Sequence, residues 1–148
     1  MFEPELKNYI LSDVLKIGIV DVLKSNNCKI PVMPGLNMEL GECIKNSIAV
    51  NKESVAIVIA VNEGESTINT IDMLIHAINI SEGVYVDNTD LRGYEYYVIY
   101  EGSFATEDTL RSKMLKLLDE YVFKGSERLM NIYGESLESI DGCFNIKL

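Results

Sequence analysis

Few residues of this chain have the types and spacing that chemistry at a protein site requires. The only histidine, His76, lies in the sequence Leu-Ile-His-Ala-Ile, and no cysteine lies near it in the sequence. The cysteines Cys28, Cys43 and Cys143 are widely separated and form no Cys-x-x-Cys pair. Such scattered residues are typical of structural thiols in a reducing compartment. We therefore expect no catalytic residue and no metal ligand among them.

The segment Asp87-Asn88-Thr89-Asp90 resembles the start of a calcium-binding loop. A loop of that kind needs a glycine in its middle and a bidentate glutamate at its end. Counted from Asp87, those positions hold Arg92 and Val98, and counting from Asp90 does not restore the pattern. We expect the segment to be a solvated turn. The glycine-rich motifs that bind phosphates are also absent from the sequence, so we expect no cofactor.

Two apolar runs carry the remaining functional signal. Residues 55–61 read Val-Ala-Ile-Val-Ile-Ala-Val and are apolar on both faces of an extended chain, which is typical of a central strand. Residues 94–101 are rich in tyrosine, and alternation puts three of the tyrosines on one face. A strand face made of aromatic rings either fills a core or offers a binding platform.

Hydrophobic spacing predicts the elements that would position these runs. Helices are predicted from Pro4 to about Lys24, from Ser66 or Thr67 to just before Gly83, and from Thr106 onward, with Thr106 as N-cap. Strands are predicted at 29–33, 36–40, 47–50, 54–61, 84–88 and 94–101. Segments 47–50 and 54–61 would form one hairpin, and 84–88 and 94–101 another.

These elements indicate an α+β class, in which three helices pack on an antiparallel sheet of about five strands. The order is helix, strands, helix, two strands, helix. Residues 1–134 are expected to form a single domain and 135–148 a C-terminal extension, whose last residues, 144–148, alternate like an added edge strand.

If the three helices cover one face of the sheet, the opposite face of the central strand stays uncovered. An exposed apolar face usually marks an interaction site. The predicted partner-binding residues are Ala56, Val58, Ala60, Tyr94, Tyr96 and Tyr100. The simplest occupant is a second copy of the chain, so we expect a homodimer that Val58→Glu would weaken.

Composition restricts the partners further. The chain has 148 residues and a formal net charge of −10, which disfavours nucleic acid and anionic membrane surfaces. No stretch is long and apolar enough to span a bilayer, and the N-terminus lacks the basic region of a signal peptide. We expect a cytoplasmic protein whose natural partner is a basic or unfolded polypeptide.

The element order resembles that of type III secretion chaperones and YbjN-like proteins. The likeness lies mainly in residues 68–133: a helix ending in the Ile-Asn-Ile-Ser-Glu-Gly of residues 78–83, a short strand at 84–87, then a strand leading into Thr106-Glu107-Asp108. The resemblance implies a small, acidic, commonly dimeric binding protein, with helices on one face of a curved antiparallel sheet and no catalytic residues.

Two functions from different classes fit these observations. The first is a non-enzymatic module, chaperone-like or adaptor, that holds a polypeptide client or partner. The second is a small acidic inhibitor of the immunity or antitoxin type, which would block a basic toxin through its carboxylates. Both are consistent with the net charge and with the lack of an active-site motif.

Overall fold

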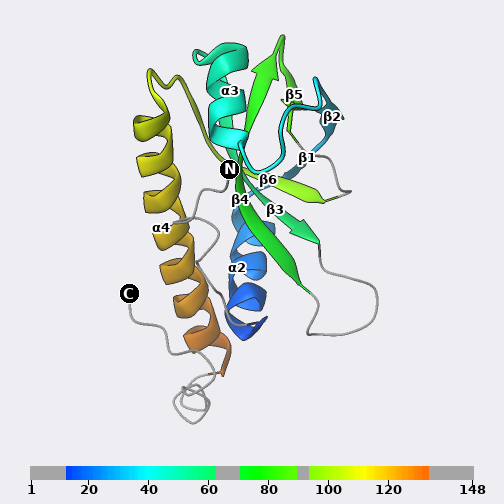
Figure 1. Cartoon of the computed structure of the whole chain (residues 1–148). Helices are drawn as coiled ribbons and strands as arrows, with labels where there is room; N and C mark the ends of the chain where they lie inside the picture. Colours follow the sequence, from blue (N-terminus) through cyan, green and yellow to red (C-terminus); the bar gives the residue numbers. More distant parts are fainter. Residues whose placement is uncertain (1–12, 63–70, 90–93, 134–148) are drawn as a thin grey trace.

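The run predicted to be the central strand forms β3 (Val55–Asn62), which lies inside a six-stranded sheet of order β1-β6-β3-β4-β5-β2. Every residue of β3 except Asn62 is buried, so both faces of the strand are covered, as predicted for a central strand. The computed structural model describes residues 13–62, 71–89 and 94–133 of the chain (Figure 1).

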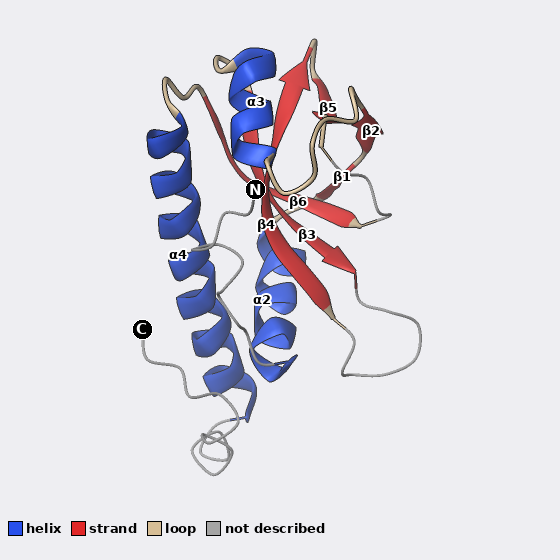
Figure 2. Cartoon of the chain, viewed as in Figure 1, coloured by secondary structure: helices blue, strands red, loops and turns tan. Residues whose placement is uncertain are grey.

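Within the described residues the fold is α+β, as predicted, with three helices on one side of a largely antiparallel sheet (Figure 2). The helices are α2 (Asp13–Asn26), α3 (Cys43–Asn51) and α4 (Glu107–Tyr133). The remaining strands are β1 (Lys29–Ile30), β2 (Val32–Pro34), β4 (Asp72–Ser81), β5 (Val84–Asp87) and β6 (Glu95–Gly102). All strand pairs are antiparallel except β2 with β5.

The sheet curls so far that its two edge strands are consecutive in the chain. β1 pairs with β6, β2 pairs with β5, and Pro31 alone separates β1 from β2. Proline has no N–H to donate to a ladder, which suits a residue at the break between two pairings. The curled sheet therefore has an inner face that is closed off from solvent. The inner apolar cluster is Ala56, Val58, Ala60, Ile78 and Tyr96.

The segment predicted as the second helix is strand β4 instead. Its isoleucines and leucine recur at spacings that fit a helical stripe, but they also alternate, with Leu74 and Ile78 facing inward and Ile75 facing the helices. This segment forms a strand because it pairs with the whole of β3, and β-propensity depends on packing against such neighbours. Glu82 and Gly83 have positive φ and form the two-residue turn from β4 to β5, so Gly83 does not end a helix.

The segment predicted as a strand at 47–50 is part of helix α3. The buried residues of α3 recur at helical spacing; they are Cys43, Ile44, Asn46 and Ser47. The strand predicted at 36–40 is also wrong, because those residues form a loop. The strands at 84–88 and 94–101 exist but do not pair as a hairpin, since β3 and β4 lie between them. The predictions for residues 4–12, for the start of the second helix at 66–70 and for the extension at 135–148 fall outside the described residues.

Helix α4 begins as predicted after Thr106, whose Oγ1 accepts a hydrogen bond from Thr109 N–H at 3.2 Å. It continues through Gly125, which neither ends nor interrupts it. α2 and α4 cross at Gly18 and Gly125: a Cβ on Gly18 would lie 2.5 Å from the Gly125 carbonyl oxygen, and one on Gly125 would lie 2.6 Å from Ile19 Cγ1. Both glycines are therefore required by close packing between the helices.

Gly125→Val is expected to destabilise the protein by about 2 kcal/mol, because overpacking forces the helices apart. Chemical denaturation measures the change in the free energy of unfolding. Glu127→Val, on the exposed side of the same helix, adds the same β-branched side chain without the clash and is expected to cost less than about 1 kcal/mol. Equal effects for the two variants would mean that the crossing tolerates a side chain.

Candidate functional site

The predicted partner-binding face lies inside the curled sheet. Ala56, Val58, Ala60 and Tyr96 are buried, and Tyr94 is half-buried, with its ring edge-on to Tyr96 at 6.4 Å between centroids. The expectation that this face is uncovered is therefore wrong: strands β1 and β2 carry the sheet around it, with Ile30 and Val32 packed against the cluster. A partner surface must be sought on other residues.

Strict alternation along β6 predicts that Tyr100 and Tyr96 share a face, but in the structure they face opposite sides of the sheet. A bulge between the β3 residues Ile57 and Val58 shifts the register, so that Val58 faces Val98 and Ile57 faces Tyr100. Tyr100 therefore turns toward the helices, where its ring lies 5.8 Å from that of Phe104.

Asp87, Asn88 and Thr89 form a buried polar anchor, whereas the sequence predicts a solvated turn. All three residues are buried, and the segment between β2 and α3 is tied to them. The bonds to this segment are Gly35 N to Asp87 O at 2.9 Å, Leu36 N to Asn88 Oδ1 at 2.9 Å, and Met38 N to Asn88 O at 2.6 Å. Asn46 of α3 completes the anchor by donating to Thr89 Oγ1 and to Glu39 O, each at 2.9 Å.

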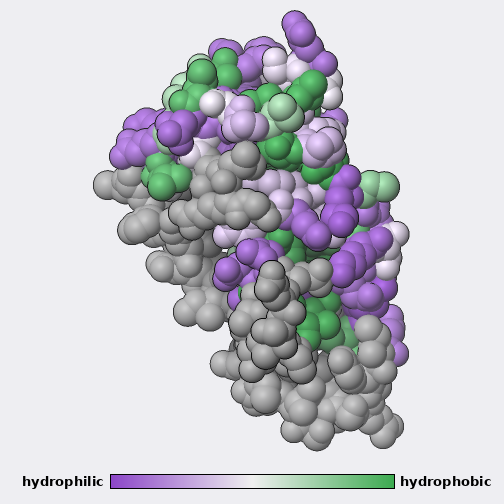
Figure 3. Space-filling view, turned by 90° about the vertical axis from the view of Figure 1, so that its right-hand side faces the viewer, coloured by the Kyte–Doolittle hydropathy of each residue, from purple (hydrophilic) through white to green (hydrophobic). Residues whose placement is uncertain are grey.

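The anchored segment presents large apolar side chains to solvent. We call residues 33–40 the apolar loop: Met33 is 53% exposed, Leu36 70% and Leu40 55%. Val84 of β5 is also exposed and neighbours Met33 diagonally, because Met33 pairs with Val86. Apolar side chains gather in the upper part of the face that carries β2 and β5 (Figure 3). Hydrogen bonds from its backbone to the buried Asp87 and Asn88 fix the loop, while its apolar side chains are exposed.

A buried pair of titratable side chains, His76 and Asp87, lies behind the anchor. His76 Nε2 is 2.9 Å from Asp87 Oδ2, and Asp87 also accepts from Thr89 N–H at 2.8 Å and Tyr96 O–H at 3.4 Å. Burial by itself lowers the pKa of His76. Interaction with Cys43 and hydrogen bonds to Asp87 and Cys43 outweigh burial and raise that pKa to about 10. His76 and Asp87 thus form a buried pair of an imidazole and a carboxylate.

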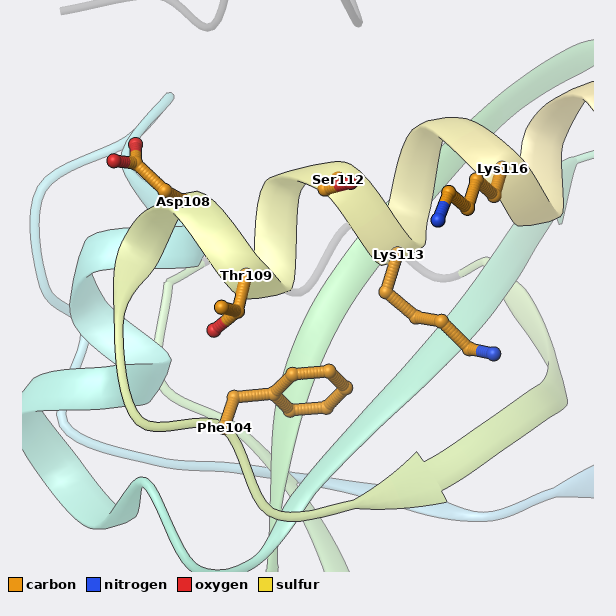
Figure 4. A pocket seen from close by; sticks show the side chains of 6 residues that line it. All are labelled: Phe104, Asp108, Thr109, Ser112, Lys113 and Lys116. Atoms are coloured by element: carbon orange, nitrogen blue, oxygen red, sulfur yellow. The ribbon is translucent and has the colours of Figure 1, made fainter.

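A shallow hollow of about 380 Å³ opens beside the first half of α4 (Figure 4). Its lining residues are Phe104, Asp108, Thr109, Ser112, Lys113 and Lys116. Lys113 Nζ lies 4.2 Å from the centre of the Tyr100 ring, so its ammonium is engaged in a cation–π contact. The hollow is open to solvent and contains no nucleophile paired with a base, so it does not define a site for chemistry.

Sequence reasoning missed both the polar anchor and the His76–Asp87 pair. His76 lies on β4 and Asp87 on β5, and only the pairing of these two strands brings the side chains together. The signal that was available is the cluster of short polar residues at 87–89 directly after a strand. Such residues form local hydrogen bonds with backbone groups, and here those bonds are buried.

Among the described residues, no group of three or more His, Cys, Asp or Glu side chains is arranged to hold a metal ion. No helix in that part of the chain has the length and apolarity needed to cross a membrane. Comparisons with protein-family models, with curated proteins and with solved structures found no match.

Proposed function

We propose that this protein is a non-enzymatic binding module that holds a segment of another polypeptide on its apolar loop. The observation that carries the proposal is the combination of an anchored backbone with exposed side chains at Met33, Leu36 and Leu40. Single exposed apolar residues are ordinary on protein surfaces, but a contiguous group of them marks interaction sites. Anchoring lowers the entropy that the loop loses when a partner binds.

The partner's chemistry follows from the loop and from the charge of the chain. Apolar anchors in the partner would pack on Leu36 and Leu40, and basic residues beside them would face an acidic protein of net charge −10. Glu39 in the loop and Glu82 in the β4–β5 turn are both exposed. A segment with leucine or phenylalanine flanked by lysine or arginine fits these requirements.

A cytoplasmic location belongs to the same proposal, because Cys28 and Cys43 are both free thiols. The proposal does not depend on the resemblance to type III chaperones and YbjN-like proteins. That resemblance begins with a helix ending near Gly83, and those residues form strand β4. A homodimer remains a prediction, in which the apolar loop of a second copy would take the partner's place.

The loop can be tested with synthetic peptides in which apolar pairs are flanked by basic residues. Fluorescence anisotropy measures the affinity of the best peptide from an array. The double variant Leu36→Asp, Leu40→Asp is expected to weaken binding at least tenfold, about 1.4 kcal/mol, because charges replace the apolar contacts. Thermal unfolding should be unchanged, since both side chains are exposed.

Phe123→Asp is the matched control, because Phe123 is 51% exposed but lies on α4, away from the loop. It should leave peptide affinity unchanged. Equal weakening by both variants, or no binding of any peptide by the wild type, contradicts the proposed site. Sedimentation velocity on the same variants tests whether the loop binds a second copy of the chain. In that case the wild type is a dimer and the double variant is a monomer.

The small acidic inhibitor is the second candidate, favoured by the net charge of −10. The two candidates differ in their response to salt. Docking on apolar side chains persists at high ionic strength, whereas recognition through exposed carboxylates is screened. Binding to a basic protein that is lost in salt and unaffected by the Leu36 and Leu40 substitutions supports the inhibitor.

A further inference from the structure

Strand β4 is longer than the strand that pairs with its outer edge. β5 pairs only with Asn79, Ile80 and Ser81, whereas β4 begins at Asp72. Among the described residues no strand pairs with the rest of this edge, and in Figure 2 the lower half of β4 has a neighbouring strand, β3, on one side only. An open strand edge presents a row of backbone N–H and C=O groups.

The pairing with β3 determines which of these groups point outward. Ile80 N donates to Ser54 O at 3.0 Å, so these two residues form a hydrogen-bonded pair. Hydrogen-bonded and non-hydrogen-bonded pairs alternate along an antiparallel ladder. The odd-numbered residues of β4, including Met73 and Ile75, therefore form the non-hydrogen-bonded pairs with β3. Their N–H and C=O groups point away from β3, toward the open edge.

Two side chains mark the ends of the open stretch and agree with this direction. Ser47 Oγ of α3 donates to Ala77 O at 3.0 Å, and Lys16 Nζ of α2 donates to Ile71 O at 3.0 Å. Both carbonyl groups belong to odd-numbered residues, and each is bonded by a side chain from a helix. Residues 72–76 lie between them, and we call this stretch the β4 slot.

We propose that the β4 slot binds an extended segment of another polypeptide, which joins the sheet as an added strand. Outward N–H and C=O groups at strand spacing are complementary to another extended backbone. The slot is short and has a helix side chain at each end, so a single extended chain fits it better than the edge of a second folded copy. It shares no residue with the apolar loop, so this inference does not rest on the proposed function.

The side chains of the slot define the chemistry of the incoming strand. Met73 is half-buried at the border of the core under the helices, and Leu74 is half-buried at the border of the inner apolar cluster. Apolar side chains on both faces of the incoming strand would extend these two cores. Asp72 is exposed at the start of β4, where it would lie beside a lysine or arginine of the partner. The ligand class is thus an apolar strand with a basic end.

Amide hydrogen exchange of the full-length protein tests whether the edge is open. The Met73 and Ile75 amides should exchange about tenfold or more faster than the Leu74 amide, because Leu74 lies on a hydrogen-bonded pair with β3. NMR measures the three rates separately. Equal protection of all three amides in the free monomer would mean that the edge is already paired, which overturns the proposal.

A peptide with basic ends, fluorescein-labelled Lys-Val-Thr-Val-Thr-Val-Lys, tests strand addition by fluorescence anisotropy at about 0.5 M salt, where attraction to the acidic chain is screened. Met73→Pro should weaken binding about tenfold or more, because proline removes an outward N–H and leaves the bonds to β3 in place. Met73→Val keeps that N–H and is the matched control, with an expected change of less than about threefold. The Leu36→Asp, Leu40→Asp variant should bind this peptide as the wild type does.

The same peptide methylated at every backbone nitrogen keeps the decision independent of how well Met73→Pro folds. It retains the side chains and the charge but cannot donate to a strand, so its binding to the wild type should be lost. Equal affinity for both peptides, or no binding of the unmethylated one, overturns the proposal. A wild-type dimer that Met73→Pro converts to a monomer in sedimentation velocity would assign the slot to a second copy and overturns the choice of partner.

Discussion

Val58→Glu is expected to unfold the protein, with a loss of about 5 kcal/mol or more in the free energy of unfolding, which is comparable with the whole stability of a domain. Val58 is fully buried on the inner face of β3, where a carboxylate would lose its hydration without gaining a free partner. The adjacent His76 is already engaged by Asp87. Chemical denaturation and circular dichroism measure the effect.

Val84→Glu is the matched control, because it makes the same change of side chain on the exposed surface of β5. It should alter stability by less than about 0.5 kcal/mol. A folded Val58→Glu protein of wild-type stability would show that the inner face is accessible after all. The substitution therefore tests closure of the sheet and no longer tests a dimer interface.

Asp87→Ala should cost about 3–5 kcal/mol, because removal of one partner from a buried ion pair leaves the other uncompensated. The side chain of Asp87 is fully buried, and its carboxylate contacts His76, Thr89 N–H and the Tyr96 hydroxyl. The loss should extend to the apolar loop, since residues 87–89 hold its backbone. Hydrogen exchange at Leu36 and Met38 measures that release directly.

An exposed ion pair supplies the comparison. Lys29 Nζ lies 3.3 Å from Glu95 Oε1, but both side chains are largely open to solvent. Glu95→Ala should therefore change stability by less than about 1 kcal/mol. If Asp87→Ala costs no more than Glu95→Ala, the buried pair contributes nothing beyond an ordinary surface contact, and the anchoring role assigned to it is wrong.

The strongest local signals predicted the fold class and two of its elements. The run at 55–61 is apolar on both faces, and only a covered central strand satisfies that pattern. Thr106 with acidic residues behind it places the start of α4, because N-capping depends on adjacent residues alone. The segment of β4 was predicted as a helix, and part of α3 was predicted as a strand. Short apolar runs fit both the helical and the strand period, and contacts with residues distant in sequence determine which structure forms.

The candidate site could not be predicted in the same way. Burial of Asp87 depends on β5 lying between β4 and β2, and the sequence suggested β6 as its neighbour. The distance from His76 to Asp87 depends on that same pairing. Leu36 and Leu40 are exposed although they are apolar. The alternation of apolar residues at 36–40 predicted a strand because it was read as the buried face of one, whereas the segment is a loop.

The bent segment that closes the sheet also sets the order in which the chain assembles. Lys29 and Ile30 pair with Tyr97 and Tyr96, and Val32 pairs with Tyr85, so none of these bonds can form until the later strands have been synthesised. Joining such distant residues is slow, because the entropy of loop closure is lost before the contacts form. The segment that holds β1 and β2 is synthesised before the strands it pairs with, so completion of the inner core is expected to be a late step in folding.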